Sequence, residues 1–154
     1  MKYDNQNLVT KNRKAYHDFT ISEEYEAGIA LLGTEVKSIR NGQINLKDSY
    51  AKIKNDEVFL VNCHISPYFE AGKSNHEPER ERKLLLKKRE IRKIKKYIEE
   101  KGNTLVPLRV YITAKGLIKI AVGMGQGKKN YDKRTALAEK QSQREIDRIR
   151  KDIY

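Results

Sequence analysis

Lysine and arginine side chains are the chemically most prominent groups of this chain, and two segments concentrate them. Residues 80–101 hold eleven Lys or Arg against four Glu, and residues 128–154 hold nine Lys or Arg against five Asp or Glu. These two segments supply most of the formal net charge of +12. Ammonium and guanidinium groups bind phosphate oxygens, so the pattern favours nucleic acid as the partner, with an anionic membrane second.

Signatures of catalysis are weak. The three histidines lie far apart in the sequence, and no P-loop, GxSxG or HExxH motif occurs. Glu26 and Glu35 could form a carboxylate pair, as in a metal-dependent nuclease, but Glu35 falls on a predicted helix where a surface position explains it equally well. Cys63 lies in an apolar run beside His64, without a second Cys/His cluster at ligand spacing. We therefore predict a binding protein, not an enzyme, with no metal and no cofactor.

The elements that must position these groups are mainly strands. We predict two strands within residues 15–31 that meet near Ser22–Glu23, two around a turn at Asn55–Asp56, and two around Lys115–Gly116. Residues 1–14 are predicted as a loose lead-in, with His17 in the first strand. A long loop is predicted from residue 66 onward.

Two helices complete the predicted fold. A short one lies between Gly33 and Gly42, with Thr34 as a possible cap, and a long one carries isoleucines at 91, 94 and 98. Strand pairs joined this tightly must be antiparallel, and the six strands of these three pairs suggest a small OB-like barrel. Cations of the long helix then form its outward face, and basic barrels of this kind more often bind RNA or single strands.

The chain divides into a domain of residues 1–127 and a basic tail of residues 128–154. The tail has too few apolar residues to offset the entropy of ordering a free helix, so we predict disorder alone and a helix on binding. No stretch approaches the roughly 20 apolar residues that span a bilayer, and the first residues lack the apolar core of a signal peptide. A cytoplasmic, monomeric protein that does not enter membranes is the expectation.

Seven segments, in one order and spacing, resemble the SsrA-binding protein family (small protein B, SmpB). They are NRKAYHDF (12–19), EAGIALLGTEVKSIRNG (26–42), LKDSYAKI (46–53), EVFLVNCHISPY (57–68), PERERKLLLKKREI (78–91), KGNTLVPL (101–108) and GKKNYDKR (127–134). The resemblance covers essentially the whole chain from about residue 12 onward. It implies an OB-like barrel and a role in trans-translation, the rescue of bacterial ribosomes stalled on messages that lack a stop codon.

The resemblance also implies a partner RNA and the residues that bind it. The domain would bind the tRNA-like domain of transfer-messenger RNA (SsrA), on which elongation factor Tu and alanyl-tRNA synthetase also act. The residues that fall in the family's RNA-binding motifs are Asn12, His17, Glu26, Lys83, Leu85, Lys87, Lys88 and Lys119. Many relatives have a histidine where this chain has Lys87.

The tail is assigned to the ribosome by the same resemblance. Tyr131 would stack on a base of the decoding centre, Lys133 and Arg134 would pair with ribosomal RNA phosphates, and Asp132 would orient its neighbours. The residues that follow would lie as a helix in the empty messenger channel. The matched tail residues are Gly127, Lys128, Lys129, Tyr131, Asp132, Lys133 and Arg134. A general ribosomal or single-strand RNA-binding OB protein is the main alternative, and a nuclease is a distant third.

Overall fold

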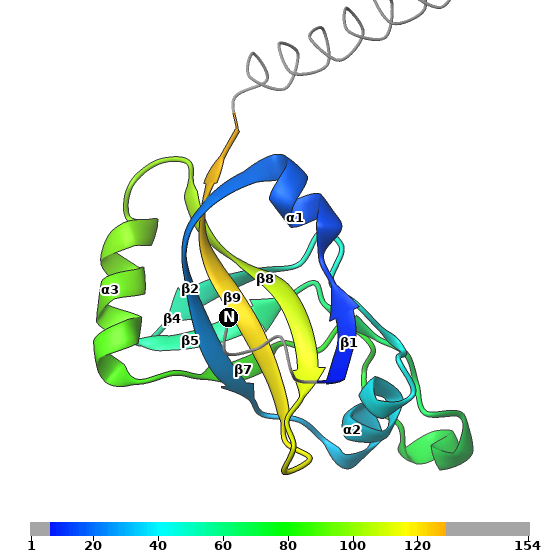
Figure 1. The fold of residues 1–154 in the computed structure, drawn as a ribbon. Helices are drawn as coiled ribbons and strands as arrows, with labels where there is room; N and C mark the ends of the chain where they lie inside the picture. Colours follow the sequence, from blue (N-terminus) through cyan, green and yellow to red (C-terminus); the bar gives the residue numbers. More distant parts are fainter. Residues whose placement is uncertain (1–6, 129–154) are drawn as a thin grey trace, which may run out of the picture.

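The computed structural model describes residues 7–128, which form a mainly β fold with a few helices (Figure 1). The strands are β1 (Asn7–Lys11), β2 (Phe19–Ile29), β3 (Ile44–Asn45), β4 (Tyr50–Lys54), β5 (Glu57–Val61), β6 (His64–Ile65), β7 (Arg82–Leu85), β8 (Asn103–Ile112) and β9 (Ile118–Gly127). The helices are α1 (Arg13–Asp18), α2 (Gly33–Arg40), α3 (Lys88–Ile98) and the 3₁₀ segment η1 (Phe69–Ser74).

The strand pairings close into a ring. Seven strands follow the order β1-β8-β4-β5-β7-β2-β9, and β9 pairs again with β8, so that six of them enclose the interior and β1 lies on the edge of β8. Every pairing in the described chain is antiparallel, as expected from the short connections. A separate two-stranded sheet joins β3 to β6.

Three local predictions are confirmed. Asn55 and Asp56 form the β4–β5 turn with φ of 53° and 58°, a left-handed conformation that Asn and Asp tolerate well. The hairpin of β8 and β9 lies where the alternating apolar residues placed it. Both predicted helices are present as α2 and α3, and Ile94 of α3 is fully buried beneath the helix.

The N-terminal part of the prediction was wrong. Instead of a loose lead-in, residues 7–11 form β1 against β8, and His17 lies in α1 and not in a strand. The predicted turn at Ser22–Glu23 is a bulge in the single long strand β2, where the register against β9 shifts between Ile21 and Glu23. A bulge and a tight turn share a local break in alternation, so the sequence alone did not separate them.

Strand β7 was missed altogether. It lies at the end of the predicted loop, and its four residues pair with β5 on one side and β2 on the other. Arg82 and Leu84 point into the protein while Lys83 and Leu85 point outward. The inward arginine hides the usual alternation of apolar and polar residues that marks a strand.

The core fills the ring. Residues from facing strands meet there, among them Leu60, Leu84, Leu105, Ile120 and Val122, each no more than 1% exposed. Helix α3 packs against the outside of the ring and is visible at its left edge in Figure 1. Within residues 7–128 no helix has both the length and the apolar content that crossing a bilayer requires. The ring is therefore the scaffold that holds the outward-facing groups.

Candidate nucleic-acid interface

A groove of about 580 Å³ on the outside of the ring brings together four of the predicted site residues. Glu26 comes from β2, Leu85 from the end of β7, Lys87 from the connection to α3, and Lys119 from β9. Glu26 and Lys119, the first and the last of the four in the sequence, are 93 positions apart, so only the closure of the ring brings these residues together. We call this hollow, with the residues that line it, the β2 groove.

Gly28 is the floor of the β2 groove. It is paired with Leu85 of β7 on one side and with Lys119 of β9 on the other, so the three residues form a row across the sheet. A Cβ at position 28 would stand 3.2 Å from the Cβ of Leu85. The missing side chain therefore keeps the space between Leu85 and Lys119 open.

The walls of the β2 groove differ in chemistry. Leu85 is 53% exposed although its neighbour Leu84 is 1% exposed, which is a consequence of strand alternation. Glu26 is exposed on β2 and Lys119 is half-buried on β9. A carboxylate, an ammonium group and an apolar side chain can together accept hydrogen bonds from bases or sugars, pair with a phosphate and stack under a base.

Lys87 stands where α3 begins, and the helix start orients it. The Glu90 carboxylate accepts a hydrogen bond from the Lys87 backbone N–H at 2.9 Å, which caps the helix and places an acid in its first turn. The Lys87 side chain is exposed at the rim of the β2 groove. Lys88, one residue further, lines a different hollow with Arg92 and Lys95.

Asn12 caps the start of α1 and His17 lies on α1, and both are apart from the residues that line the β2 groove. Asn12 is 6% exposed, and its side chain is fully used inside the protein: Nδ2 donates to the carbonyls of Leu46 and Pro107, and Oδ1 accepts from the Ala15 N–H at the start of α1. His17 is exposed, with Nδ1 2.9 Å from the Asp18 carboxylate. Asn12 therefore holds α1 in place, while His17 is available to a partner.

Strand β9 leads directly to the tail. Gly127 is its last residue, and Lys128 donates from its backbone N–H to the Asp18 carbonyl at 2.9 Å and from Nζ to the Tyr16 carbonyl at 3.2 Å. The chain therefore leaves the ring beside α1 (Figure 1). The other predicted tail residues lie outside the described part of the chain; they are Lys129, Tyr131, Asp132, Lys133 and Arg134.

The basic helix is more neutralised than its sequence indicates. Acids from other elements reach two of its lysines, Glu23 at 3.0 Å from Lys93 and Asp56 at 2.9 Å from Lys95. These hydrogen bonds lower the pKa of both carboxyl groups. On β7, Lys83 lies 3.3 Å from Glu57. Among the described residues, the cations of α3 without an ion pair are Lys88, Arg89, Arg92 and Lys96.

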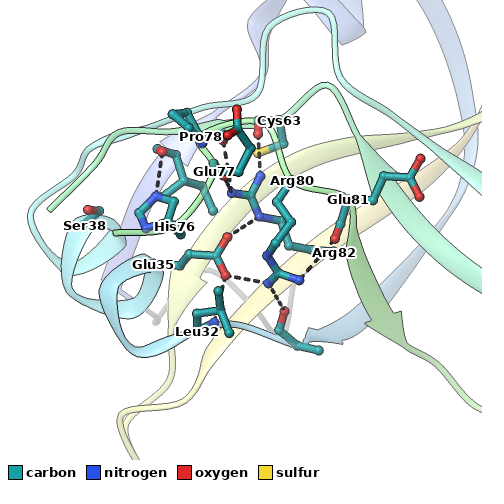
Figure 2. A network of polar contacts seen from close by, with 12 residues as sticks. Leu32, Glu35, Ser38, Cys63, His76, Glu77, Pro78, Arg80, Glu81 and Arg82 are labelled. Atoms are coloured by element: carbon teal, nitrogen blue, oxygen red, sulfur yellow. Dashed lines mark hydrogen bonds and ion pairs between the residues drawn. The ribbon is translucent and has the colours of Figure 1, made fainter. Parts of the chain in front are cut away.

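The suggested carboxylate pair of Glu26 and Glu35 does not exist. Glu35 is fully buried and bound by two arginines, at 2.6 Å from Nη2 of Arg80 and 2.5 Å from Nε of Arg82 (Figure 2). Burial opposes its ionisation, but hydrogen bonds from Arg80, the Leu32 N–H and Arg82 outweigh that cost and lower its pKa. Glu35 is therefore an internal anchor and not a catalytic acid, and its helix position is not a surface position.

Arg82 extends this cluster to the backbone of the preceding loop. It is fully buried and donates to the carbonyls of Cys63, Glu77 and Pro78. His76 adds a further link, with one ring nitrogen 2.8 Å from Thr34 Oγ1 and the other 2.9 Å from the Ile65 carbonyl. We call the side chains of Glu35, His76, Arg80 and Arg82 the clasp.

Cys63 is a buried core residue, as predicted. It is fully buried between β5 and β6, and desolvation raises the pKa of its thiol to about 12, so it is not a thiolate at neutral pH. His64 beside it points to solvent. Residues 7–128 contain no group of three His, Cys, Asp or Glu placed to hold a metal ion.

The sequence reasoning missed several residues that shape the β2 groove: Glu24, Tyr25, Gly28, Leu86 and Glu90. Glu24 and Gly28 lie on the same side of β2 as Glu26, at spacings of two residues, so a correct reading of β2 as one strand would have found them. Glu24 also bonds Arg109 of β8 at 2.8 Å. That ion pair links β2 to β8 beside the groove.

Known proteins match this chain over nearly its full length. The family model for SmpB protein matches residues 9–152. An SsrA-binding protein of Geobacillus sp. (strain WCH70) is 55% identical over 141 residues, which is 92% of this chain and 90% of the relative. That of Clostridium novyi (strain NT) is 55% identical over 146 residues, covering 95% of this chain and 92% of the relative.

A solved structure is also similar. A chain of the structure described as "tmRNA-SmpB: a journey to the center of the bacterial ribosome" superposes with a TM-score of 0.67 at 46% identity, covering 79% of this chain and 85% of that one. The match in fold agrees with the match in sequence, and the family model extends over the elements that build the β2 groove. The chain described here therefore belongs to the SmpB protein family.

Proposed function

We propose that this protein binds the tRNA-like domain of transfer-messenger RNA and delivers it to stalled bacterial ribosomes for trans-translation. Its membership of a family whose curated members are named SsrA-binding protein supports the proposal, as does its likeness to a chain of a tmRNA-SmpB structure. The protein acts by binding and needs no cofactor. We further propose that the ring is an OB-like barrel of residues 1–127, followed by a tail of residues 128–154.

The observation that carries the proposal is the composition of the β2 groove. Glu26, Leu85, Lys87 and Lys119 converge there from four elements although nothing but the fold brings them together. In the proposed complex, the Lys119 ammonium pairs with a phosphate, Leu85 lies under a base or sugar, and Glu26 accepts hydrogen bonds from base amino groups or hydroxyls. Three further residues extend the contact: Lys83, on the same face of β7 as Leu85, Lys88 at the start of α3, and His17 on α1.

Asn12 has a different role in this proposal. Because its amide is occupied by Leu46, Pro107 and Ala15, it acts on RNA only by holding α1, and so His17, in position. The tail, from Gly127 and Lys128 onward, enters the decoding centre and the empty messenger channel. There Tyr131 stacks on a base, Lys129, Lys133 and Arg134 pair with phosphates, and Asp132 orients its neighbours.

The remaining partners follow from the same RNA. Elongation factor Tu and alanyl-tRNA synthetase act on transfer-messenger RNA together with this protein, which works as a cytoplasmic monomer. Coupling of the ring to the RNA raises the effective concentration of the tail at the ribosome, so that weak contacts between the tail and the ribosome are sufficient.

Competition binding tests the proposal directly. A labelled tRNA-like domain RNA bound to the full-length protein is challenged with an unstructured RNA of equal length and concentration. We expect the unstructured RNA to displace little of the labelled one, and we expect binding to weaken steeply with salt because several phosphates are contacted. If the unstructured RNA displaces the labelled RNA as well as an unlabelled tRNA-like domain RNA does, the protein is a general single-strand-binding protein.

A further inference from the structure

Phe69 is the most exposed large apolar side chain that the structure describes, at 96% exposure. It begins η1, the turn that follows β6 and projects beside α2, drawn in green at the lower right of Figure 1. It is not among the residues of the β2 groove, and neither the fold nor the proposed tail contact uses it. A phenylalanine ring offers an apolar edge and two flat faces, each as large as a pyrimidine ring.

The turn that presents Phe69 is closed by its own hydrogen bonds. The Asn75 side chain accepts from the Tyr68 N–H at 2.9 Å and donates to the Tyr68 carbonyl at 2.6 Å, so the two ends of η1 are joined. Gly72 allows the kink between them, with φ of 58°. Phe69 is therefore held at a fixed place without any contact that buries its ring.

The clasp fixes this turn to the ring. His76, directly after Asn75, is held between Thr34 of α2 and the Ile65 carbonyl. Arg82 donates to the carbonyls of Glu77 and Pro78 (Figure 2). On the other side of η1, Ser38 donates to the Ser66 carbonyl at 2.7 Å. Ordering a loop on binding reduces affinity, and η1 avoids this loss because its conformation is already fixed in the folded protein.

The position of the turn relates it to the β2 groove. Strand β7 begins at Arg82 in the clasp and ends at Leu85 in the groove, a span of about 10 Å at ~3.3 Å per residue. The clasp and the β2 groove both lie toward the end of β2 and the start of β9. The tail leaves from the opposite end of β9, at Gly127. The segment that carries η1 therefore joins the ring at the start of β7, on the side of the β2 groove and not on the side where the tail leaves.

The surroundings of Phe69 suit a polyanion. Nζ of Lys37 lies 5.3 Å from the centre of the Tyr68 ring, so this aromatic ring carries a cation on its face. Lys73 is exposed on η1 itself, and Arg40 is exposed at the end of α2. The adjacent acid, Glu70, accepts a hydrogen bond from the Tyr68 hydroxyl at 2.9 Å.

From these observations we infer that Phe69 stacks on an unpaired base of the same RNA that occupies the β2 groove, with Lys37 and Lys73 beside the neighbouring phosphates. Single-stranded bases are recognised in this way because every base has a π-face that an aromatic ring can cover. The inference rests on the proposed function, since it takes the RNA in the groove to be the tRNA-like domain. It adds a second contact, made by η1, to the contact made by the β2 groove.

Affinity of the full-length protein for the tRNA-like RNA, measured by fluorescence anisotropy with labelled RNA, tests the inference. Phe69→Ala should weaken binding roughly five- to 150-fold, the range seen when an aromatic platform for one base is removed. Phe69→Leu should weaken it similarly, because leucine is apolar but has no ring, whereas Phe69→Tyr should retain most of the affinity. Leu8→Ala removes another exposed apolar side chain, on β1, and should change nothing.

A spectroscopic measurement makes the contact visible. The chain contains no tryptophan, so Phe69→Trp introduces the only tryptophan, which can be excited apart from the nine tyrosines. Stacking on a base should quench its emission when the tRNA-like RNA is added. An unquenched emission at saturating RNA would overturn the inference, as would a Phe69→Leu variant that binds like the original protein, which would indicate an apolar pocket instead of a base. If Phe69→Ala binds the RNA with normal affinity but is captured less well by stalled ribosomes, Phe69 contacts the ribosome, and the inference is equally refuted.

The same series separates this inference from the function it depends on. If the protein prefers the tRNA-like RNA to an unstructured RNA of equal length, but Phe69→Ala binds it unchanged, only the contact at η1 is refuted. If that preference is absent in the original protein, the proposed function itself fails.

Discussion

Oε2 of Glu35 accepts a hydrogen bond from Nε of Arg82 at 2.5 Å, and both side chains are fully buried. The pair joins helix α2 to the first residue of β7, and the two residues are 47 positions apart in the chain. Because β7 ends at Leu85, the same pair sets where the β2 groove receives its apolar wall. The clasp is thus a structural requirement of the candidate interface although it lies outside it.

Removing the Glu35 carboxylate should destabilise the protein strongly. Glu35→Gln leaves the Arg82 guanidinium buried without its counter-charge, and breaking a buried pair in this way costs about 3–5 kcal/mol. The measurement is the free energy of unfolding from urea denaturation. Arg80→Ala is the matched comparison: its side chain is 34% exposed and Arg82 keeps Glu35, so a much smaller loss is expected. Equal losses in both variants would contradict the central place of Arg82.

The same carboxylate should make stability depend on acid pH. The pKa of Glu35 in the folded protein lies below its ordinary value of 4.5, so its contribution is complete above that value and is lost as the pH falls through the lowered pKa. The free energy of unfolding should therefore decline below about pH 4.5, and less so in Glu35→Gln. Asp56→Asn is the control: its pKa is also lowered, by Lys95, but the pair is exposed and should leave the acid profile nearly unchanged.

Sequence and structure agree best where neighbours in the chain decide the conformation. Asn55–Asp56 make a turn from their own backbone preferences, and the isoleucines of α3 form one stripe against the core, with Ile94 buried and Ile91 and Ile98 partly buried. The groove residues Glu26, Leu85 and Lys119 were named through the family resemblance, because nothing in their spacing indicates that β2 pairs with both β7 and β9.

Long-range pairing explains what the sequence did not show. Residues 7–11 form a strand only because β8 offers an edge, and a buried arginine in β7 looks like loop composition until Glu35 is placed beside it. The charge of residues 80–101 was likewise counted without the acids that tertiary structure supplies. Glu23 and Asp56 come from β2 and from the β4–β5 turn, more than 38 positions away from their lysines.

Two substitutions in the β2 groove should separate apolar from electrostatic contacts. Lys119→Ala removes one phosphate contact, so the slope of log affinity against log salt should fall by about 1. Leu85→Ala should weaken RNA binding without altering that slope, and at 53% exposure it should leave the melting temperature nearly unchanged. Affinity is measured for the tRNA-like RNA over a salt series. Lys47→Ala, an exposed lysine elsewhere on the surface, is the control and should alter neither quantity.

Asn12 and His17 should behave oppositely although both lie in the N-terminal motif. Asn12→Ala removes the cap of α1 and two buried hydrogen bonds, so stability should fall by at least ~1 kcal/mol, and amide exchange should show early opening of α1. His17→Ala should leave stability unchanged and weaken RNA binding. Asn12→Asp keeps the capping oxygen but places a second, negatively charged oxygen against the carbonyls of Leu46 and Pro107, so it should be no more stable than Asn12→Ala. A stable Asn12→Ala variant with impaired RNA affinity would instead make Asn12 a direct contact.

Truncation should separate RNA binding from action on the ribosome. The cut belongs after Lys128, because Lys128 bonds the carbonyls of Tyr16 and Asp18 and its removal would loosen α1. The shortened protein should bind the tRNA-like RNA with nearly the original affinity, since the β2 groove, α1 and η1 are intact, but it should not support peptide tagging on stalled ribosomes. Tyr131→Ala in the full-length chain should reproduce the tagging defect with normal RNA binding. If truncation removes RNA affinity as well, the tail is itself a clamp for that RNA, and the proposed division of roles between ring and tail is wrong.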